Sequence, residues 1–151
     1  MAQNFYAVTG INGETLVPVE CPVASGAAAT IEPGMSVTKS ANTAVIESSN
    51  GAATSALVWG IAANTSTDTA SAAGVVLTYR APVIACKCKA TTPANLSASV
   101  RYTLVTLDVT GTTHTVDEND TTTGWITILD YDNATDGNCI VQYPCRFVLW
   151  T

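Results

Sequence analysis

The chain has 151 residues, of which 47% are hydrophobic and only 12% are charged, and its formal net charge is −6. This length fits one domain or two very small ones. The six basic residues are scattered along the chain, whereas nucleic-acid binding requires clustered Lys and Arg. We therefore expect no nucleic-acid partner.

Because charged residues are scarce, most of the surface has to be built from Thr, Ser, Asn, Ala and Gly. Covering such a surface with an interface costs little free energy, because few charges must be desolvated. Residues 1–8 contain neither the basic nor the apolar segment of a signal peptide. No apolar run approaches the ~18 residues of a membrane-spanning helix. These features predict a protein that is made in a cytoplasm and has no membrane partner.

Residues 1–30 are predicted to form an extended N-terminal arm. Pro18 and Pro22 exclude a helix in this segment and disfavour a central strand, because proline cannot donate a backbone hydrogen bond. An extended apolar segment is suited to lying across another surface, and the alternative is an edge strand and a loop within the same domain. The residues expected to contact such a surface are Phe5, Tyr6, Leu16, Val17, Val19 and Val23.

Residues 31–151 are predicted to form a β domain made of short strands. Its apolar segments are separated by polar turns and show no sustained helical periodicity. The most strand-like run, residues 74–85, is rich in β-branched residues. This pattern predicts an all-β protein, either a small barrel or a sandwich. The other expected strands lie near residues 35–37, 44–46, 56–62, 96–109, 121–132 and 138–149.

Two parts of the β domain resemble each other. The strand-like run around Tyr79 is similar to the run around Tyr143, and almost the same spacing separates Ile61 from Ile126. Internal repetition determines the architecture, because each copy is expected to adopt the same arrangement. The two degenerate repeats predicted from this similarity are residues 31–92 and 93–151.

The five cysteines are Cys21, Cys86, Cys88, Cys139 and Cys145. Without an export signal they are expected to be reduced and buried, although bridges could form in a particle released from the cell. Cys86 and Cys88 are two residues apart on an expected strand, so they share a face and cannot easily bridge each other. A disulfide would instead join one of them to Cys139 or Cys145.

Few residues are candidates for catalysis or metal binding. The only histidine, His114, lies in a Thr-rich segment and is expected to be an exposed turn residue. The cysteine spacing does not fit a zinc site. The acidic stretches 117–120 and 130–137 could hold calcium, but the second lacks an oxygen ligand at Ala134, so solvated turns are expected. Because no nucleophile–base pair or phosphate loop is visible, we expect no enzyme activity, catalytic residue, metal or cofactor.

The three tryptophans could belong to a binding surface or to the core. Trp59 and Trp125 occupy similar places in the two repeats, which favours roles in the core. Trp150 lies one residue from the end of the sequence, and it is the better candidate for an aromatic anchor in an interface.

Residues 55–88 contain a Gly60-Ile61-Ala62 strand, a small polar loop and an apolar strand that runs into a turn. This pattern resembles the core of tailed-bacteriophage head-decoration (capsid cement) proteins, the family of the phage lambda decoration protein. The turn at Pro33 and Gly34 before a Val strand is similar to the opening of the same unit. The resemblance implies a small β-tulip fold on the outside of a capsid, commonly trimeric, with an N-terminal arm. The five cysteines and the long second repeat depart from the lambda protein.

The resemblance and the low-charge surface together predict a structural virion protein on the outer surface of a capsid. Its partner would be the major capsid protein, and a homotrimer would cement neighbouring subunits. Deleting residues 1–30 would then abolish attachment and leave the β domain folded. The alternative is a surface-displayed binding module, carbohydrate-recognising or adhesin-like, with an exposed Trp or Tyr patch.

Overall fold

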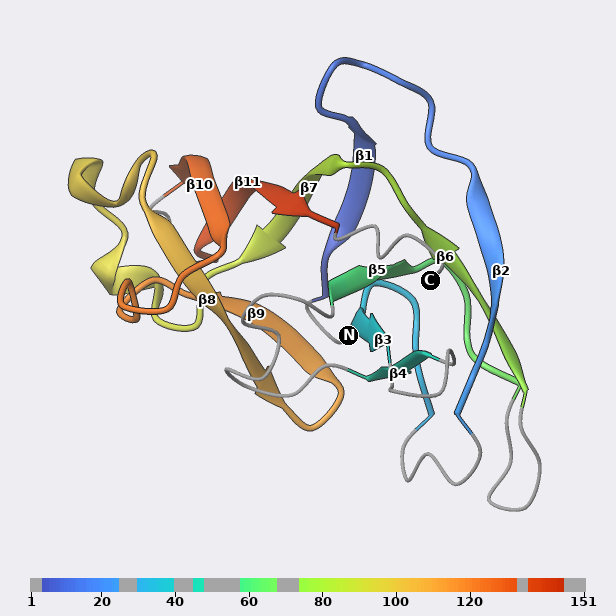
Figure 1. Ribbon diagram of the computed structural model, residues 1–151. Coiled ribbons are helices and arrows are strands. Elements are labelled where there is room, and N and C mark those ends of the chain that lie inside the picture. The colour runs from blue at the N-terminus through green and yellow to red at the C-terminus, as the bar shows by residue number, and fades with distance from the viewer. Residues whose placement is uncertain are drawn as a thin grey trace.

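The computed structural model describes residues 4–24, 30–39, 45–47, 58–67, 74–132 and 136–145. Within these ranges, eleven strands form two antiparallel sheets, and the helical elements are two short 3₁₀ turns, Pro93–Asn95 and Ala98–Val100 (Figure 1). The predicted all-β class is therefore confirmed, and the architecture is a small sandwich.

The larger sheet has six strands in the order β1-β7-β11-β10-β8-β9. A short hairpin joins β8 to β9 through Gly111, whose φ of 60° suits the tight turn that the sequence predicts there. The strands are β1 (Tyr6–Gly10), β7 (Val83–Lys89), β11 (Asn138–Pro144), β10 (Ile126–Asp132), β8 (Leu104–Thr110) and β9 (Thr113–Asp117).

The smaller sheet has five strands in the order β2-β6-β5-β3-β4. The turn before β3 has Pro33 and Gly34 at its centre, and Met35 N donates to Glu32 O across it at 3.1 Å. Gly34 has a φ of 84°, and an added Cβ would lie 2.6 Å from Phe5 O, so glycine is required there. The strands are β2 (Pro18–Pro22), β6 (Val75–Tyr79), β5 (Val58–Ala62), β3 (Ser36–Lys39) and β4 (Val45–Glu47).

The two sheets share one strand order. Counted along the chain, β2-β6-β5-β3-β4 matches β7-β11-β10-β8-β9 strand for strand, and β1 is an additional strand beside β7. We call strands β2–β6 the first unit and strands β7–β11 the second unit. Tyr79 on β6 and Tyr143 on β11 lie on corresponding strands. The chain is therefore built from two units, as predicted.

The boundary between the units differs from the predicted one after residue 92. The run 74–85, which looks like one strand in the sequence, is divided between β6 in the smaller sheet and β7 in the larger sheet. The chain crosses between sheets at residues 80–82, where Pro82 cannot donate a ladder hydrogen bond. The second unit therefore begins with β7, and the first unit begins with β2.

The described part of the predicted N-terminal arm, residues 4–24, belongs to the sandwich. Its two strands are edge strands, β1 against β7 and β2 against β6. Phe5, Cys21 and Val23 are buried, because their apolar side chains find partners in the cores of the same domain. The edge-strand alternative therefore describes this segment better than a separate arm.

Two hydrophobic clusters fill the sandwich. The main core combines the larger sheet with Phe5 and with Val58 and Ile61 of β5, so the smaller sheet packs against the larger one. The minor core lies on the smaller sheet and includes Met35 and Trp59. Every residue of β5 is buried, which makes β5 the strand that both cores share.

Candidate functional site

Exposed apolar side chains gather on the two N-terminal edge strands. Tyr6 and Val8 on β1 are 68% and 50% exposed, and Val17 and Val19 at β2 are 69% and 52% exposed. Val17 and Val19 are two residues apart, so extended backbone places them on one face. We call Val17 and Val19 the β2 edge patch.

The free side of β2 has few hydrogen-bond donors. Val23 N donates to Gly74 O at 2.9 Å, and the alternation of an antiparallel ladder then directs the backbone groups of Val19 and Cys21 toward β6. Pro18, Glu20 and Pro22 face away from β6. Two of these three residues have no N–H, so the free edge offers chiefly carbonyl acceptors and apolar side chains.

The structure divides the residues predicted to form an interface. Tyr6, Val17 and Val19 are exposed as expected. Leu16 is partly buried against the main core. Phe5 and Val23 are 3% and 1% exposed, so assigning them to an interface is wrong: they pack inside the domain. Trp150 lies outside the described residues.

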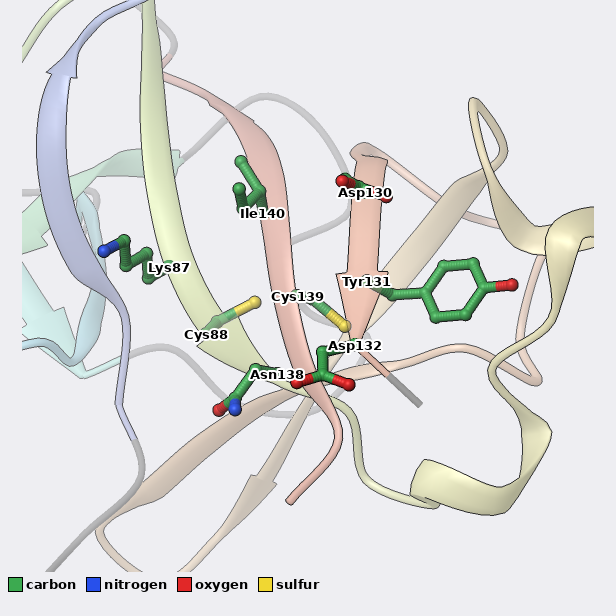
Figure 2. A pocket seen from close by; sticks show the side chains of 8 residues that line it. All are labelled: Lys87, Cys88, Asp130, Tyr131, Asp132, Asn138, Cys139 and Ile140. Atoms are coloured by element: carbon green, nitrogen blue, oxygen red, sulfur yellow. The ribbon is translucent and has the colours of Figure 1, made fainter. Parts of the chain in front are cut away.

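A pocket of about 460 Å³ opens on the larger sheet (Figure 2). Lys87, Ile140 and Asp130 lie directly opposite one another on β7, β11 and β10. Lys89, Asn138 and Asp132 form the next row. We call these two rows the outer face. The complete lining of the pocket is Lys87, Cys88, Asp130, Tyr131, Asp132, Asn138, Cys139 and Ile140.

Charge on the outer face is partly paired. Arg101 Nη2 donates to Asp130 Oδ1 at 2.7 Å, and the Arg101 guanidinium lies 5.1 Å from the Tyr131 ring centre. The Tyr131 backbone N–H, followed by Arg101, lowers the pKa of Asp130. This carboxylate is therefore ionised at neutral pH and is held by Arg101.

All five cysteines are buried, free thiols, so none of the disulfides considered from the sequence is formed. Burial raises the pKa of Cys139 to about 12 and that of Cys145 to about 11. It also raises the pKa values of Cys86 and Cys88. Neutral thiols are poor nucleophiles. The four residues therefore lack the electrostatic activation of a catalytic cysteine.

His114 is fully buried on β9, so the prediction of an exposed turn residue is wrong. Its Nδ1 accepts from Ser36 N at 3.1 Å, and Ser36 Oγ lies 2.5 Å from Tyr143 Oη. Tyr143 Oη donates to Gly60 O at 3.1 Å. We call Ser36, Gly60, His114 and Tyr143 the polar junction. It ties the two sheets together inside the protein, and burial lowers the pKa of His114 to about 4.

The acidic stretch 117–120 is only partly a solvated turn. Glu118 is buried and accepts from Thr92 N at 3.2 Å and from Asn95 Nδ2 at 3.2 Å. This carboxylate holds the β7–β8 connection. Residues 133–135, within the second acidic stretch, lie outside the described part of the chain. Among the described residues, no group of three or more His, Cys, Asp or Glu side chains is placed to hold a metal ion.

Two of the tryptophans lie in or against the cores. Trp59 is buried in the minor core, under the Arg80 guanidinium at 3.5 Å from the ring centre. Trp125 packs against the main core and meets Tyr143 edge-on at 5.1 Å. Neither indole joins the outer face. The aromatic residue opposite Lys87 on that side of the sheet is instead Tyr6.

Sequence reasoning missed the outer face because its residues come from three strands of unknown register. Alternation alone places Asp130 and Asp132 on one face of a strand, but it does not show that Lys87 and Ile140 lie beside them. The junction at His114 left no sequence signal, because its partners come from the other unit.

No family model, curated protein or solved structure matches the chain. In the part of the chain that the structure describes, no helix has the length and apolar character needed to cross a bilayer.

Proposed function

We propose that the protein is a structural component of a phage virion that binds the outside of the capsid and cements neighbouring major capsid subunits. The observation that carries this proposal is the β2 edge patch: Val19 on the edge strand β2 and Val17 directly before it are each more than half exposed. Burying a valine side chain contributes roughly 1.5–3 kcal/mol. A partner that covered both would gain affinity with little charge to desolvate.

A comparison of the first strands of the two units supports this proposal. In the second unit, the strand that corresponds to β2 is β7, and β1 covers its outer edge. In the first unit, the strand order leaves β2 (Pro18–Pro22) at the edge, and β4 meets the chain only beyond the end of β2, where Val23 bridges Val45. A capsid subunit would occupy the position that β1 occupies in the second unit.

Assembly would strengthen such a contact. A homotrimer on a local three-fold position presents three copies of the β2 edge patch to three capsid subunits at once. Linked contacts bind with a high effective concentration, so individually weak patches can hold the shell together. The same arrangement would resist separation of the capsid subunits.

The test compares Val17→Thr/Val19→Thr with Val8→Thr. Threonine keeps the shape and strand preference of valine and replaces one methyl group by a hydroxyl, which is costly to desolvate in an interface. Val8 is the matched control because it is as exposed as Val19 but lies on the edge of the other sheet. The proteins are mixed with capsids that lack the decoration protein and are then sedimented. We expect the double variant to lose capsid binding at least tenfold and Val8→Thr to bind normally.

Equal binding of the double variant and the unmodified protein would overturn the proposal. Deleting residues 1–30 is not a suitable test, contrary to the expectation from the sequence. The deletion removes β1 and β2 and opens both cores, so loss of binding would follow from unfolding.

A carbohydrate-binding module is the second candidate, and the outer face favours it. Asp130, Asp132 and Asn138 bring carboxylate and amide groups into one shallow pocket (Figure 2), and such groups fix the orientation of polar ligands. Saturable binding on a glycan array that Asp132→Ala abolishes would favour this function over capsid attachment.

A further inference from the structure

Two of the five thiols face each other across neighbouring strands. Cys88 of β7 and Cys139 of β11 are directly opposite in the antiparallel ladder. Both side chains are buried, and Figure 2 shows them on adjacent strands, pointing in the same direction. The two sulfur atoms therefore lie on one face of the sheet, where each can reach the other.

The other three cysteines have different neighbours. Cys86 lies opposite Val141. Cys145 N donates to Pro82 O at 3.1 Å, so its partner across the ladder is a proline. Cys21 lies in the minor core, where Trp59 Nε1 donates to its sulfur at 3.0 Å. The register thus distinguishes Cys88 and Cys139 from every other pair.

We propose that Cys88 and Cys139 form a redox-active dithiol that closes reversibly into a cross-strand disulfide. With oxidised glutathione as the oxidant, one thiolate attacks the glutathione disulfide and releases one reduced glutathione. The second thiolate then attacks the mixed disulfide, forms the Cys88–Cys139 bond and releases the second glutathione. The protein loses two protons and two electrons, and glutathione gains them.

The ladder geometry predicts that this bond is easily reduced. Ala90 N donates to Gly137 O at 2.9 Å, and alternation makes Cys88 and Cys139, two residues further along, another hydrogen-bonded pair. Cα atoms in such pairs are about 5.5 Å apart, which a disulfide can span. Their Cβ atoms lie about 5 Å apart, beyond the usual disulfide value of about 3.8 Å. A stretched bridge has a high reduction potential and opens readily.

The position of the pair explains how an oxidant reaches it. Cys139 is the second residue of β11 and Cys88 is the last but one of β7, so the pair lies at the end of the ladder. Strand ends open more often than strand centres. Both side chains point to the face opposite the outer face and are buried in the main core, so an oxidant reaches the sulfur atoms when this end of the ladder opens. Because burial, followed by the Glu118 charge, raises the pKa of Cys139, closure is expected to accelerate as pH rises.

The experiment incubates the full chain with oxidised glutathione at pH 8.5 and maps peptides by mass spectrometry without reduction. We expect a Cys88–Cys139 crosslink that dithiothreitol removes. We also expect phenylarsine oxide, which binds close dithiols, to protect both thiols from alkylation. Cys88→Ala should abolish the crosslink and the protection, whereas the matched control Cys86→Ala should retain both.

Refolding from urea in a glutathione redox buffer tests whether the two cysteines can form a bond when burial no longer keeps glutathione away from them. If the folded protein does not oxidise but the refolded protein carries the Cys88–Cys139 bond, access limits the rate and the proposal stands. Absence of that bond after refolding, or a different pairing, would overturn it. The proposal does not depend on capsid binding.

Discussion

The two units share a strand order but differ at their first strands. In the second unit, β7 lies between β1 and β11; in the first unit, β2 remains at the edge. The difference follows from the residues that face outward. Lys87 and Ala85 of β7 can donate backbone hydrogen bonds to β1, whereas Pro18 and Pro22 of β2 cannot donate. A repeated fold can thus keep one edge open by placing prolines at two of the three outward-facing positions of a strand.

The largest expected effect comes from the corresponding tyrosines of the two units. Tyr143 is fully buried between Phe5 and Trp125 and joins the polar junction, whereas Tyr79 is only partly buried. Tyr143→Ala should lower the free energy of unfolding by about 3–5 kcal/mol. Tyr79→Ala should lower it by about 1–2 kcal/mol. Urea unfolding followed by Trp fluorescence measures both values.

If Tyr143→Ala is too unstable to purify, Tyr143→Phe isolates the hydroxyl. This variant keeps the ring and leaves Ser36 Oγ and Gly60 O without their Tyr143 partner, which should cost about 1–3 kcal/mol. If Tyr143→Ala and Tyr79→Ala lowered the free energy of unfolding equally, the two tyrosines would contribute equally to stability. That result would contradict the expectation from their different burial.

The next largest effect is a pH dependence from His114, which links the units through Ser36. The pKa of His114 is about 4 in the folded protein, below its ordinary value of 6.5. Between these values the unfolded chain binds the proton more tightly, so stability falls as pH falls from 6.5 to 4. The loss should reach about 3 kcal/mol. Urea unfolding at a series of pH values measures it.

His114→Gln is the control for this pH dependence. Glutamine can accept from Ser36 N and does not titrate, so the stability of the variant should vary less between pH 6.5 and 4. Curves of equal slope would show that other groups cause the acid sensitivity.

The smallest effect concerns the stacking of Arg80 on Trp59 within the first unit. Arg80→Lys keeps the charge but loses the planar stack at 3.5 Å and the Nε bond to Trp59 O. We expect a loss of about 1 kcal/mol. Arg101→Lys, whose stack on Tyr131 is longer and exposed, should change the midpoint of thermal unfolding less. A larger loss of stability for Arg101→Lys than for Arg80→Lys would contradict this prediction.

The sequence predicts the strands and the duplication because both leave local signals. Short apolar runs between polar turns indicate the strands, although the expected strand at 96–109 contains the 3₁₀ turn Ala98–Val100 and β8 begins only at Leu104. The similar runs around Tyr79 and Tyr143 reveal the two units. It does not predict the unit boundary, because residues 74–85 read as one strand until the sheet assignment is known. The sequence also does not predict that Phe5 and Val23 are buried. An edge strand of the domain and a separate arm are both extended and apolar, so their sequences look alike.

The junction at His114 and the pairing of Cys88 with Cys139 depend on register between distant strands. A shift of one residue would turn either side chain to the opposite face. Composition and spacing therefore identify the groups, and only the ladder identifies their partners.

The pairing of β1 with β7 has a consequence for synthesis on the ribosome. Tyr6 pairs with Lys87, and His114 N donates to Asn4 Oδ1 at 2.9 Å. The N-terminal strand therefore emerges early and has no partner until β7 has been made. Contacts of such separation slow folding because the loop must close first. The first unit can pair its own strands during that interval, while the N-terminal strand joins the sheet only as the second unit folds.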